Sequence, residues 1–254
     1  MAVKDATRRF SSRVDNYVRY RPGYPREIVQ LLENDCGLTP DSIIADIAFG
    51  TGIFTRLLLE NGNHVFGVEP NTDMRKAGEE FLRGYPKFKS VEGTAEETTL
   101  VDRSVDFVTA AQAAHWFNLK EARREFQRIL KPAGWAVLIW NERRTDSTDF
   151  LRDYEQLLVT YGTDYQDIRH ERTTAAIDTF FSPSPFQQKT FELIQQFDYA
   201  GLEGRLLSSS YAPSLGEPNH ELMLKKLRRI FKEHQKNGYV AFEYDTKVYY
   251  GQLK

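Results

Sequence analysis

The sequence contains one cysteine, no excess of basic residues and no long apolar run. Because Cys36 is the only cysteine, an intrachain disulfide is excluded, which fits a reducing compartment. Lys and Arg number 34 against 36 Asp and Glu, so the basic excess typical of nucleic-acid binders is missing. No stretch approaches about 18 consecutive apolar residues, and the N-terminus has no apolar signal core. We therefore expect a cytoplasmic protein without nucleic-acid or membrane partners.

Apolar stretches alternate with amphipathic ones from residue 42 onward. Strands are expected at 42–48, 64–69, 88–93, 104–112, 135–141, 186–197 and 239–253. Helices are expected at 1–20, 25–34, 53–60, 71–83, 119–131, 150–162, 201–210 and 217–236. Strands that are apolar throughout and separated by helices indicate a parallel sheet covered on both faces. The pattern therefore predicts an α/β, doubly wound, Rossmann-like sheet of seven mostly parallel strands, with an antiparallel strand at the edge.

The whole chain, 1–254, is expected to form a single domain with a small helical cap. Residues 1–35 would form lid helices, and 36–141 a cofactor-binding core. The pattern changes after Asn141, so 142–185 is interpreted as a cap insertion over the ligand edge of the sheet. Residues 186–254 would complete the sheet.

The stretch DIAFGTG follows the first predicted strand and predicts a ligand site. Gly50 and Gly52 allow a tight turn that a ligand can approach, and the helix behind them offers backbone N–H groups. Glu69 ends the next strand, 17 residues past Gly52, where a carboxylate can accept hydrogen bonds from both ribose hydroxyls. A dinucleotide site would need a third glycine where Thr55 stands. A smaller nucleoside cofactor is therefore favoured, with a nicotinamide-dependent oxidoreductase as the alternative.

Together with GVEPNTDM, GTAEETTLVDRSVDFVTAAQAAHWF and LKPAGW, this turn resembles class I S-adenosylmethionine-dependent methyltransferases. The resemblance covers about residues 42–141. The flanking stretches RYRPGYP, LSSSYAP and YDTKVYYGQL look like the branch that includes trans-aconitate methyltransferase and related small-molecule methyltransferases. The implied activity is methylation of a small molecule, at a carboxylate or hydroxyl oxygen, with S-adenosylhomocysteine as the second product. A methyltransferase-like protein that binds without turnover is a further alternative.

The resemblance also implies a set of cofactor-binding residues. The expected set is Tyr20, Arg21, Asp46, Ala48, Gly50, Gly52, Glu69, Pro70, Asn71, Met74, Ala95, Glu96 and Gln112. Asp46 and the glycines would line the methionine part, Arg21 would meet its carboxylate, and Gln112 would lie beside its amine. Ala48 departs from the family, which usually has glycine there. If that position needs a positive φ, cofactor affinity should suffer.

A second set of residues is predicted to bind the methyl acceptor. Methyl transfer depends mostly on positioning, and a general base is needed for a hydroxyl acceptor but not for an ionised carboxylate. His115 is the candidate base, or it orients the acceptor. The candidate substrate-binding residues are Tyr17, Tyr24, His115, Trp116, Arg144 and Tyr211. Arg143 is a further candidate for an anionic substrate. The five histidines show no ligand spacing, so no metal is expected. We expect a monomer or a homodimer.

Overall fold

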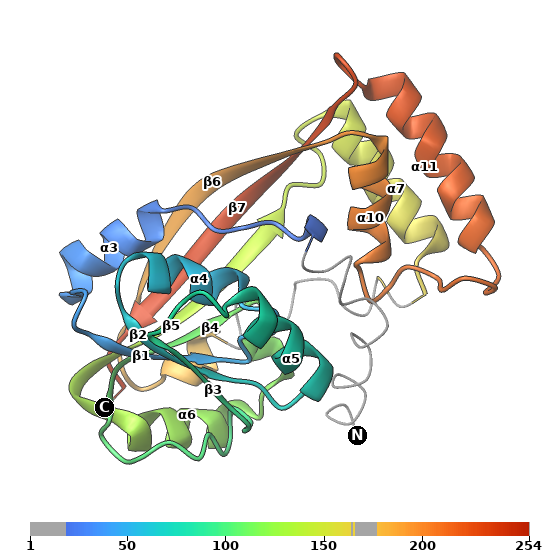
Figure 1. Cartoon of the computed structure of the whole chain (residues 1–254). Coiled ribbons are helices and arrows are strands. Elements are labelled where there is room, and N and C mark those ends of the chain that lie inside the picture. The colour runs from blue at the N-terminus through green and yellow to red at the C-terminus, as the bar shows by residue number, and fades with distance from the viewer. Residues whose placement is uncertain (1–18, 164, 166–176, 254) are drawn as a thin grey trace.

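The computed structural model describes residues 19–163, 165 and 177–253 (Figure 1). Tyr17 and nearly all of the helix expected over 1–20 lie outside these residues. The strands are β1 (Ile43–Ile47), β2 (His64–Val68), β3 (Phe88–Val91), β4 (Val105–Ala111), β5 (Leu130–Arg143), β6 (Gln187–Phe197) and β7 (Val240–Gly251). The helices are α3 (Glu27–Cys36), α4 (Ile53–Glu60), α5 (Thr72–Phe81), the 3-10 turn η2 (Ala114–Trp116), α6 (Leu119–Ile129), α7 (Asp149–Tyr161), α10 (Tyr199–Leu207) and α11 (His220–His234).

The strands form one seven-stranded sheet in the order β3-β2-β1-β4-β5-β7-β6, as the sequence predicts for a doubly wound fold. The first five pair in parallel, and the order reverses between β1 and β4, next to which ligands bind in such sheets. The expected antiparallel strand, β7, is present at that end of the sheet but lies one place in from the edge. It pairs with β5 on one side and with the outermost strand, β6, on the other.

Alternation along the strands separates two hydrophobic layers. Ala45 and Ile47 of β1 pack with α6, whereas Ile44 between them packs with α3 and α4. Successive side chains of a strand point to opposite faces, so a strand with helices on both sides is apolar at every position. The uniform apolar runs in the sequence therefore arise because helices cover both faces of the sheet, as the sequence prediction assumed.

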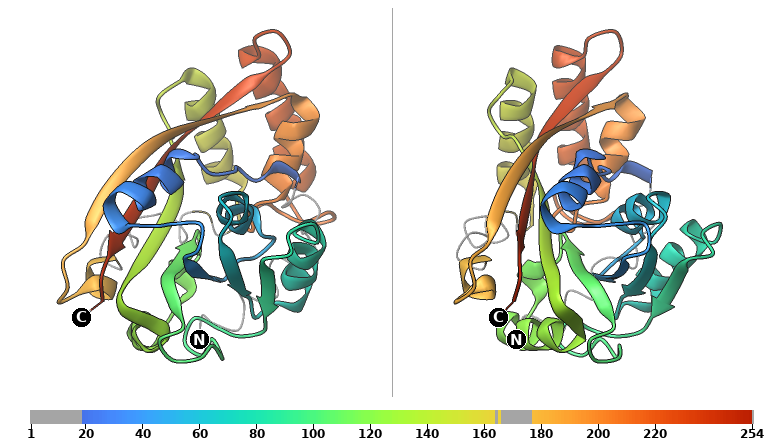
Figure 2. Two further views of the ribbon diagram at one scale, coloured as in Figure 1. Left: turned by 60° about the vertical axis from the view of Figure 1, so that its left-hand side comes forward. Right: turned by 90° about the vertical axis from the view of Figure 1, so that its left-hand side faces the viewer.

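A third hydrophobic cluster lies beyond the sheet and unites α7, α10 and α11 with the ends of β6 and β7. Figure 1 shows these helices standing beside the sheet, reached by the two long strands, and Figure 2 shows the same group from two other sides. α7 comes from the segment expected to form the cap, but α10 and α11 come from the segment expected only to complete the sheet. The helical cap is thus built from two stretches that are far apart in the sequence.

Among the described elements, the largest difference from the predicted boundaries is at β5. β5 was expected over 135–141, but it begins at Leu130, directly after α6, and continues to Arg143. Its start is irregular: Val105 of β4 pairs with Leu130, but Phe107 pairs with Trp135, so the Pro-Ala-Gly segment bulges out instead of ending the pairing. The extension at the other end includes Arg143, which pairs with Tyr244 of β7 and whose side chain contacts Glu155 of α7.

Candidate active site

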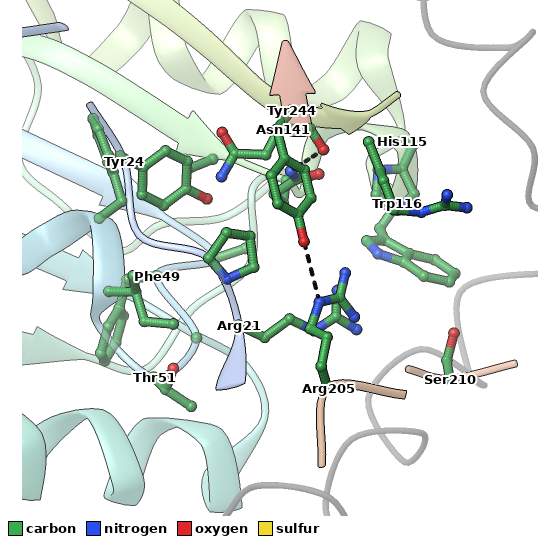
Figure 3. Close-up of a pocket in the computed structure, with 18 of the residues that line it drawn as sticks. Arg21, Tyr24, Phe49, Thr51, His115, Trp116, Asn141, Arg205, Ser210 and Tyr244 are labelled. Atoms are coloured by element: carbon green, nitrogen blue, oxygen red, sulfur yellow. Dashed lines mark hydrogen bonds between the residues drawn. The ribbon is translucent and has the colours of Figure 1, made fainter. Parts of the chain in front are cut away.

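A cavity of about 520 Å³ lies where the carboxyl ends of β1, β4 and β5 meet the cap. One wall comes from the sheet edge and the other from the cap and the segment before α3. The lining residues are Arg21, Pro22, Tyr24, Asp46, Ala48, Phe49, Gly50, Thr51, Ile53, Phe54, Ala111, Gln112, His115, Trp116, Asn141, Arg143, Thr145, Tyr165, Arg205, Ser210, Tyr211 and Tyr244. Figure 3 shows this cavity with the sheet edge on one side and Arg205 and Ser210 on the other.

The glycine turn forms the floor of the sheet-side wall. Gly50 and Gly52 have φ values of 59° and 84°, in the left-handed region that glycine enters without strain. Gly52 is the N-cap of α4, so the first backbone N–H groups of that helix lie beside the cavity. Thr51, between the two glycines, has a buried hydroxyl without a hydrogen-bond partner among the described residues. A buried polar atom of this kind at a cavity wall is suited to a ligand.

Ala48 also takes a left-handed conformation, with φ at 55°. The position therefore does need a positive φ. Under that condition, the sequence analysis expected alanine in place of glycine to lower the affinity for the cofactor. In this region the Cβ atom lies too close to the following carbonyl oxygen, which destabilises the conformation by roughly 1–2 kcal/mol. Gln112, at the end of β4, has φ at 58° as well, and its amide donates to the Asn141 carbonyl at 3.0 Å.

Asp46 is a buried carboxyl group in the wall of the cavity. It accepts hydrogen bonds from the hydroxyls of Thr55 at 2.6 Å and Thr109 at 2.9 Å. Burial raises the pKa of Asp46 to about 6, against an ordinary 3.8, because the two hydroxyls offset only part of the lost hydration. The group therefore titrates close to neutrality, and a cation placed beside it would favour the ionised form.

Glu69 holds the turn and the end of β2 together. One of its oxygens accepts from the backbone N–H of Gly50 at 3.0 Å, and the other from that of Asn71 at 2.9 Å. Asn71 caps α5 by accepting from Asp73 and Met74. Burial raises the pKa of Glu69 against the opposing effect of the two N–H donors. Carboxylate oxygens accept more than one hydrogen bond, so Glu69 can also take ribose hydroxyls.

Arginine and tyrosine side chains line the cap-side wall. The Arg143 guanidinium is ion-paired with Glu155 and donates to the Tyr165 hydroxyl at 3.2 Å. Arg205 of α10 lies deeper and donates to the Tyr244 hydroxyl at 3.4 Å and to Ser209 Oγ at 3.0 Å. Burial alone would raise the pKa of Tyr211, but Arg205, Arg143 and Arg21 outweigh it and lower that pKa. Three guanidinium groups thus act on one phenol.

The segment before α3 joins the two walls. Arg21 donates to the Ser208 carbonyl at 2.9 Å, at the end of α10. The ring of Tyr20 covers Gly204, where an added Cβ would lie 2.1 Å from the ring. Tyr24 meets Phe54 of α4 with ring centroids 5.0 Å apart. These contacts place Arg21 between the glycine turn and the cap.

His115 and Trp116 form a corner of the cavity. Both belong to η2, directly after β4, and their ring centroids are 4.8 Å apart. Figure 3 shows them on the side of the cavity opposite Tyr24. His115 is exposed at the rim, where it can contact a molecule that enters.

Ten of the sequence-predicted residues line the cavity, and others do not. The lining residues among them are Arg21, Tyr24, Asp46, Ala48, Gly50, Gln112, His115, Trp116, Arg143 and Tyr211. Those outside the lining are Tyr20, Gly52, Glu69, Pro70, Asn71, Met74, Ala95, Glu96 and Arg144. Several of these sit directly behind it: an added Cβ on Gly50 would touch Met74 at 3.4 Å. Ala95 is core, and Glu96 accepts from the backbone N–H of Asn118.

Arg144 is directed elsewhere. It pairs with Glu192, Glu243 and Asp245, away from the cavity lining. The sequence reading missed Arg205, Tyr165 and Tyr244 as site residues. A cationic position within an apolar helical stretch, GLEGRLL, was the available signal for Arg205.

The described part of the chain also holds one group of possible metal ligands outside the cavity. Asp153, Glu233 and His234 bring one ligand atom each within 4.8 Å of one another, a grouping that linear spacing does not reveal. His234 and Asp153 already form an ion pair of 2.7 Å, and none of the three lines the cavity. None of the described helices has the length and apolar character that a membrane span requires.

Comparison with known proteins identifies the family. A model described as "Methyltransferase domain" matches residues 45–138. An uncharacterized methyltransferase of Mycobacterium tuberculosis is 30% identical over 235 residues, which cover 91% of this chain and 88% of the relative. The chain belongs to the class I S-adenosylmethionine-dependent methyltransferases.

Solved structures agree on the fold of this methyltransferase. A putative type II methyltransferase from Anaeromyxobacter dehalogenans has a TM-score of 0.70 at 21% identity, covering 92% of this chain and 98% of that one. A geranyl diphosphate methyltransferase solved in complex with S-adenosylmethionine has a TM-score of 0.50 at 12% identity, covering 90% and 85%. These likenesses concern the fold alone.

The cofactor is S-adenosylmethionine, as the sequence predicted in preference to a nicotinamide dinucleotide. The residues present fit this group. Asp46 offers a buried carboxylate for its ammonium, Arg21 a guanidinium for its carboxylate, and Thr51 an unsatisfied hydroxyl, while Glu69 lies behind Gly50 for the ribose.

Proposed function

We propose that the methyltransferase methylates an oxygen atom, of a carboxylate or a hydroxyl, in a small molecule. The observation that carries this proposal is the cationic wall opposite the glycine turn. Arg21, Arg143 and Arg205 line the cavity, and Asp46 is the only acidic residue among the lining residues of the described chain. A protonated amine entering from the cap side would be repelled by these charges, whereas an oxygen acceptor would not.

The size of the cavity supports a small acceptor. Its volume of about 520 Å³ lies within the range of ordinary ligand pockets, roughly 300–1,000 Å³. Cofactor and acceptor would share this space, because the sheet-side wall and the cap-side wall face the same cavity. The near balance of 34 basic and 36 acidic residues gives no support to a nucleic-acid substrate.

Positioning would account for most of the catalysis. S-Adenosylmethionine supplies, when bound, an electrophilic methyl group on a sulfonium that leaves as a neutral thioether. The chain's own residues then orient the acceptor and exclude water. A carboxylate acceptor is already ionised at neutral pH and needs no base. For a hydroxyl acceptor, His115, which lines the cavity, would accept the proton.

Two measurements test the proposal. Thermal unfolding with S-adenosylhomocysteine, and separately with NAD, checks the cofactor. Stabilisation of about 2.7 kcal/mol is expected at about 100 times the Kd of the former and none with NAD. The transfer of a labelled methyl group is then measured with matched small carboxylates, alcohols and amines as acceptors. We expect transfer to an oxygen atom. Binding of S-adenosylhomocysteine without transfer to any acceptor would instead favour a non-catalytic binding protein, and transfer to amines would contradict the oxygen assignment.

A further inference from the structure

Arg205 is a buried cation that forms no ion pair with any residue that the structure describes. The residue is 6% exposed, and its guanidinium donates to the hydroxyls of Tyr244 and Ser209 and lies over the Phe242 ring at 6.0 Å. Its charge also lowers the pKa of the Tyr211 phenol. Within the described chain, no carboxylate lies within ion-pair distance of it. Arg143, on the same wall, shows the usual arrangement, since Glu155 neutralises it. Figure 3 shows Arg205 extending into the middle of the cavity towards Tyr244.

Such an arrangement is unfavourable unless a ligand completes it. Taking a charged group out of water costs several kcal/mol, which a paired charge and hydrogen bonds must offset. Tyr244 at 3.4 Å is a long hydrogen bond, and the hydroxyl of Ser209 is neutral. The guanidinium therefore lines the cavity with no negatively charged acceptor among the described residues.

Arg21 adds a second positive charge nearby. It donates to the carbonyl of Ser208, and Arg205 donates to the hydroxyl of Ser209, so the two guanidinium groups bind neighbouring residues at the end of α10. Two like charges held together in a buried site repel one another, and an anion between or beside them removes that repulsion. The wall therefore favours negatively charged ligands.

The charge balance of the cavity distinguishes Arg205 from Arg21 and Arg143. The Arg143 charge is balanced by Glu155, and the Arg21 charge would be balanced by the methionine carboxylate of the cofactor. The Asp46 carboxylate would balance the ammonium of the same methionine. With S-adenosylhomocysteine bound, whose thioether is neutral, the charge of Arg205 then remains unbalanced among the described lining residues. In S-adenosylmethionine the sulfonium adds a further positive charge, which also favours an anionic acceptor.

We propose that Arg205 binds a carboxylate of the methyl acceptor and so selects carboxylate substrates. This inference rests on the proposed function and names the acceptor class for the same cavity. A guanidinium offers a planar pair of donors that matches the two oxygens of a carboxylate, which a lysine ammonium does not. Tyr244 and Ser209 orient the guanidinium, leaving its outer edge for the ligand.

The test measures binding of defined carboxylates to the complex with S-adenosylhomocysteine. Malonate, succinate and acetate are titrated against this complex by calorimetry, with malonamide as the uncharged match for malonate. We expect binding of at least one carboxylate but not of malonamide. Arg205→Gln should weaken carboxylate binding at least tenfold, and Arg205→Lys should weaken it less. Arg152→Gln is the control, because Arg152 is an exposed cap residue that pairs with Asp149.

Binding of S-adenosylhomocysteine verifies that each variant is folded and keeps the two proposals apart. If the unaltered protein fails to bind it, the proposed function fails, whatever Arg205 does. Equal carboxylate binding by the unaltered protein and Arg205→Gln would overturn the role of Arg205, as would no binding of any of the three carboxylates. The role would also be overturned if Arg205→Gln lost affinity for S-adenosylhomocysteine but kept it for 5′-methylthioadenosine, which lacks the amino-acid end. Should Arg205→Gln not fold, Arg205→Lys answers the same questions.

Discussion

The backbone N–H of Gly50 donates to the Glu69 carboxylate at 3.0 Å, which ties the glycine turn after β1 to the end of β2. The turn and the proposed ribose partner are therefore one unit, although 19 positions separate them in the sequence. A change at Glu69 should affect both the hydrogen bonds to the cofactor and the shape of the turn.

Glu69→Ala should weaken binding of S-adenosylhomocysteine at least tenfold. Hydrogen bonds to a charged group contribute about 1.5–3 kcal/mol each, and the variant loses the carboxylate that would hold the ribose. Calorimetry measures the affinity, and circular dichroism checks that the variant is folded. Glu80→Ala, which removes an exposed acid of α5 that pairs with Arg83, is the control and should bind normally. Unchanged affinity in Glu69→Ala would remove the ribose role.

Affinity for S-adenosylhomocysteine should rise with pH through about 6. Asp46 has a pKa of about 6 in the folded protein, and only its ionised form can pair with the ammonium of the methionine part. Below that pH the affinity should fall by up to tenfold per pH unit, and in Asp46→Asn it should be lower and nearly independent of pH. A parallel pH profile for both proteins would exclude Asp46 as the cause.

The same group sets a stability change of opposite sign in the protein without ligand. Because burial raises the pKa of Asp46 above its unfolded value, the neutral form is favoured in the folded state. The contribution of Asp46 to the free energy of unfolding is fully present below about pH 4 and is lost as pH rises through about 6. The loss amounts to about 3 kcal/mol, at about 1.4 kcal/mol per pKa unit. Urea unfolding of the protein and of Asp46→Asn between pH 4 and 7 checks the sign.

Ala48→Gly should increase the free energy of unfolding by about 0.5–1 kcal/mol. The substitution relieves the Cβ contact at φ 55°, partly offset by the larger conformational entropy of glycine in the unfolded chain. Ala45→Gly is the matched control, because Ala45 lies in β1 with a strand conformation, and it should lower stability. Urea unfolding measures both. A stability loss in Ala48→Gly equal to that in Ala45→Gly would show that the backbone at Ala48 is not strained.

The sheet-side wall could be predicted because its pattern is local. Asp46, Gly50 and Gly52 follow one strand within seven residues, and Glu69 ends the next strand, so the turn chemistry can be read from a short window. The mostly parallel sheet of seven strands followed from the alternation of apolar stretches with helices, whereas the order of its strands was not predicted. The position of β7 inside β6 could not be read, since both strands are amphipathic enough to be an edge.

The cap-side wall could not be predicted because it joins distant segments. Arg205 belongs to the site only through contacts with Tyr244 and with the end of its own helix, and no short pattern contains these partners. Arg143 and Arg144 show a second reason. Adjacent residues at the end of a strand point in opposite directions, so one reaches the cavity and the other reaches surface acids. The sequence analysis named both arginines as candidates, and only Arg143 lines the cavity.

The residues that line the cavity come from two parts of the chain, one inside and one outside the stretch that the family model matches. The lining residues contributed by β1, β4 and their turns all fall within 45–138, the stretch that the family model matches. Arg21, Arg143, Arg205, Tyr211 and Tyr244 all fall outside it. Apart from Arg21, the lining residues proposed for the methyl donor therefore come from the matched stretch, whereas Arg205, proposed for the acceptor, comes from outside it.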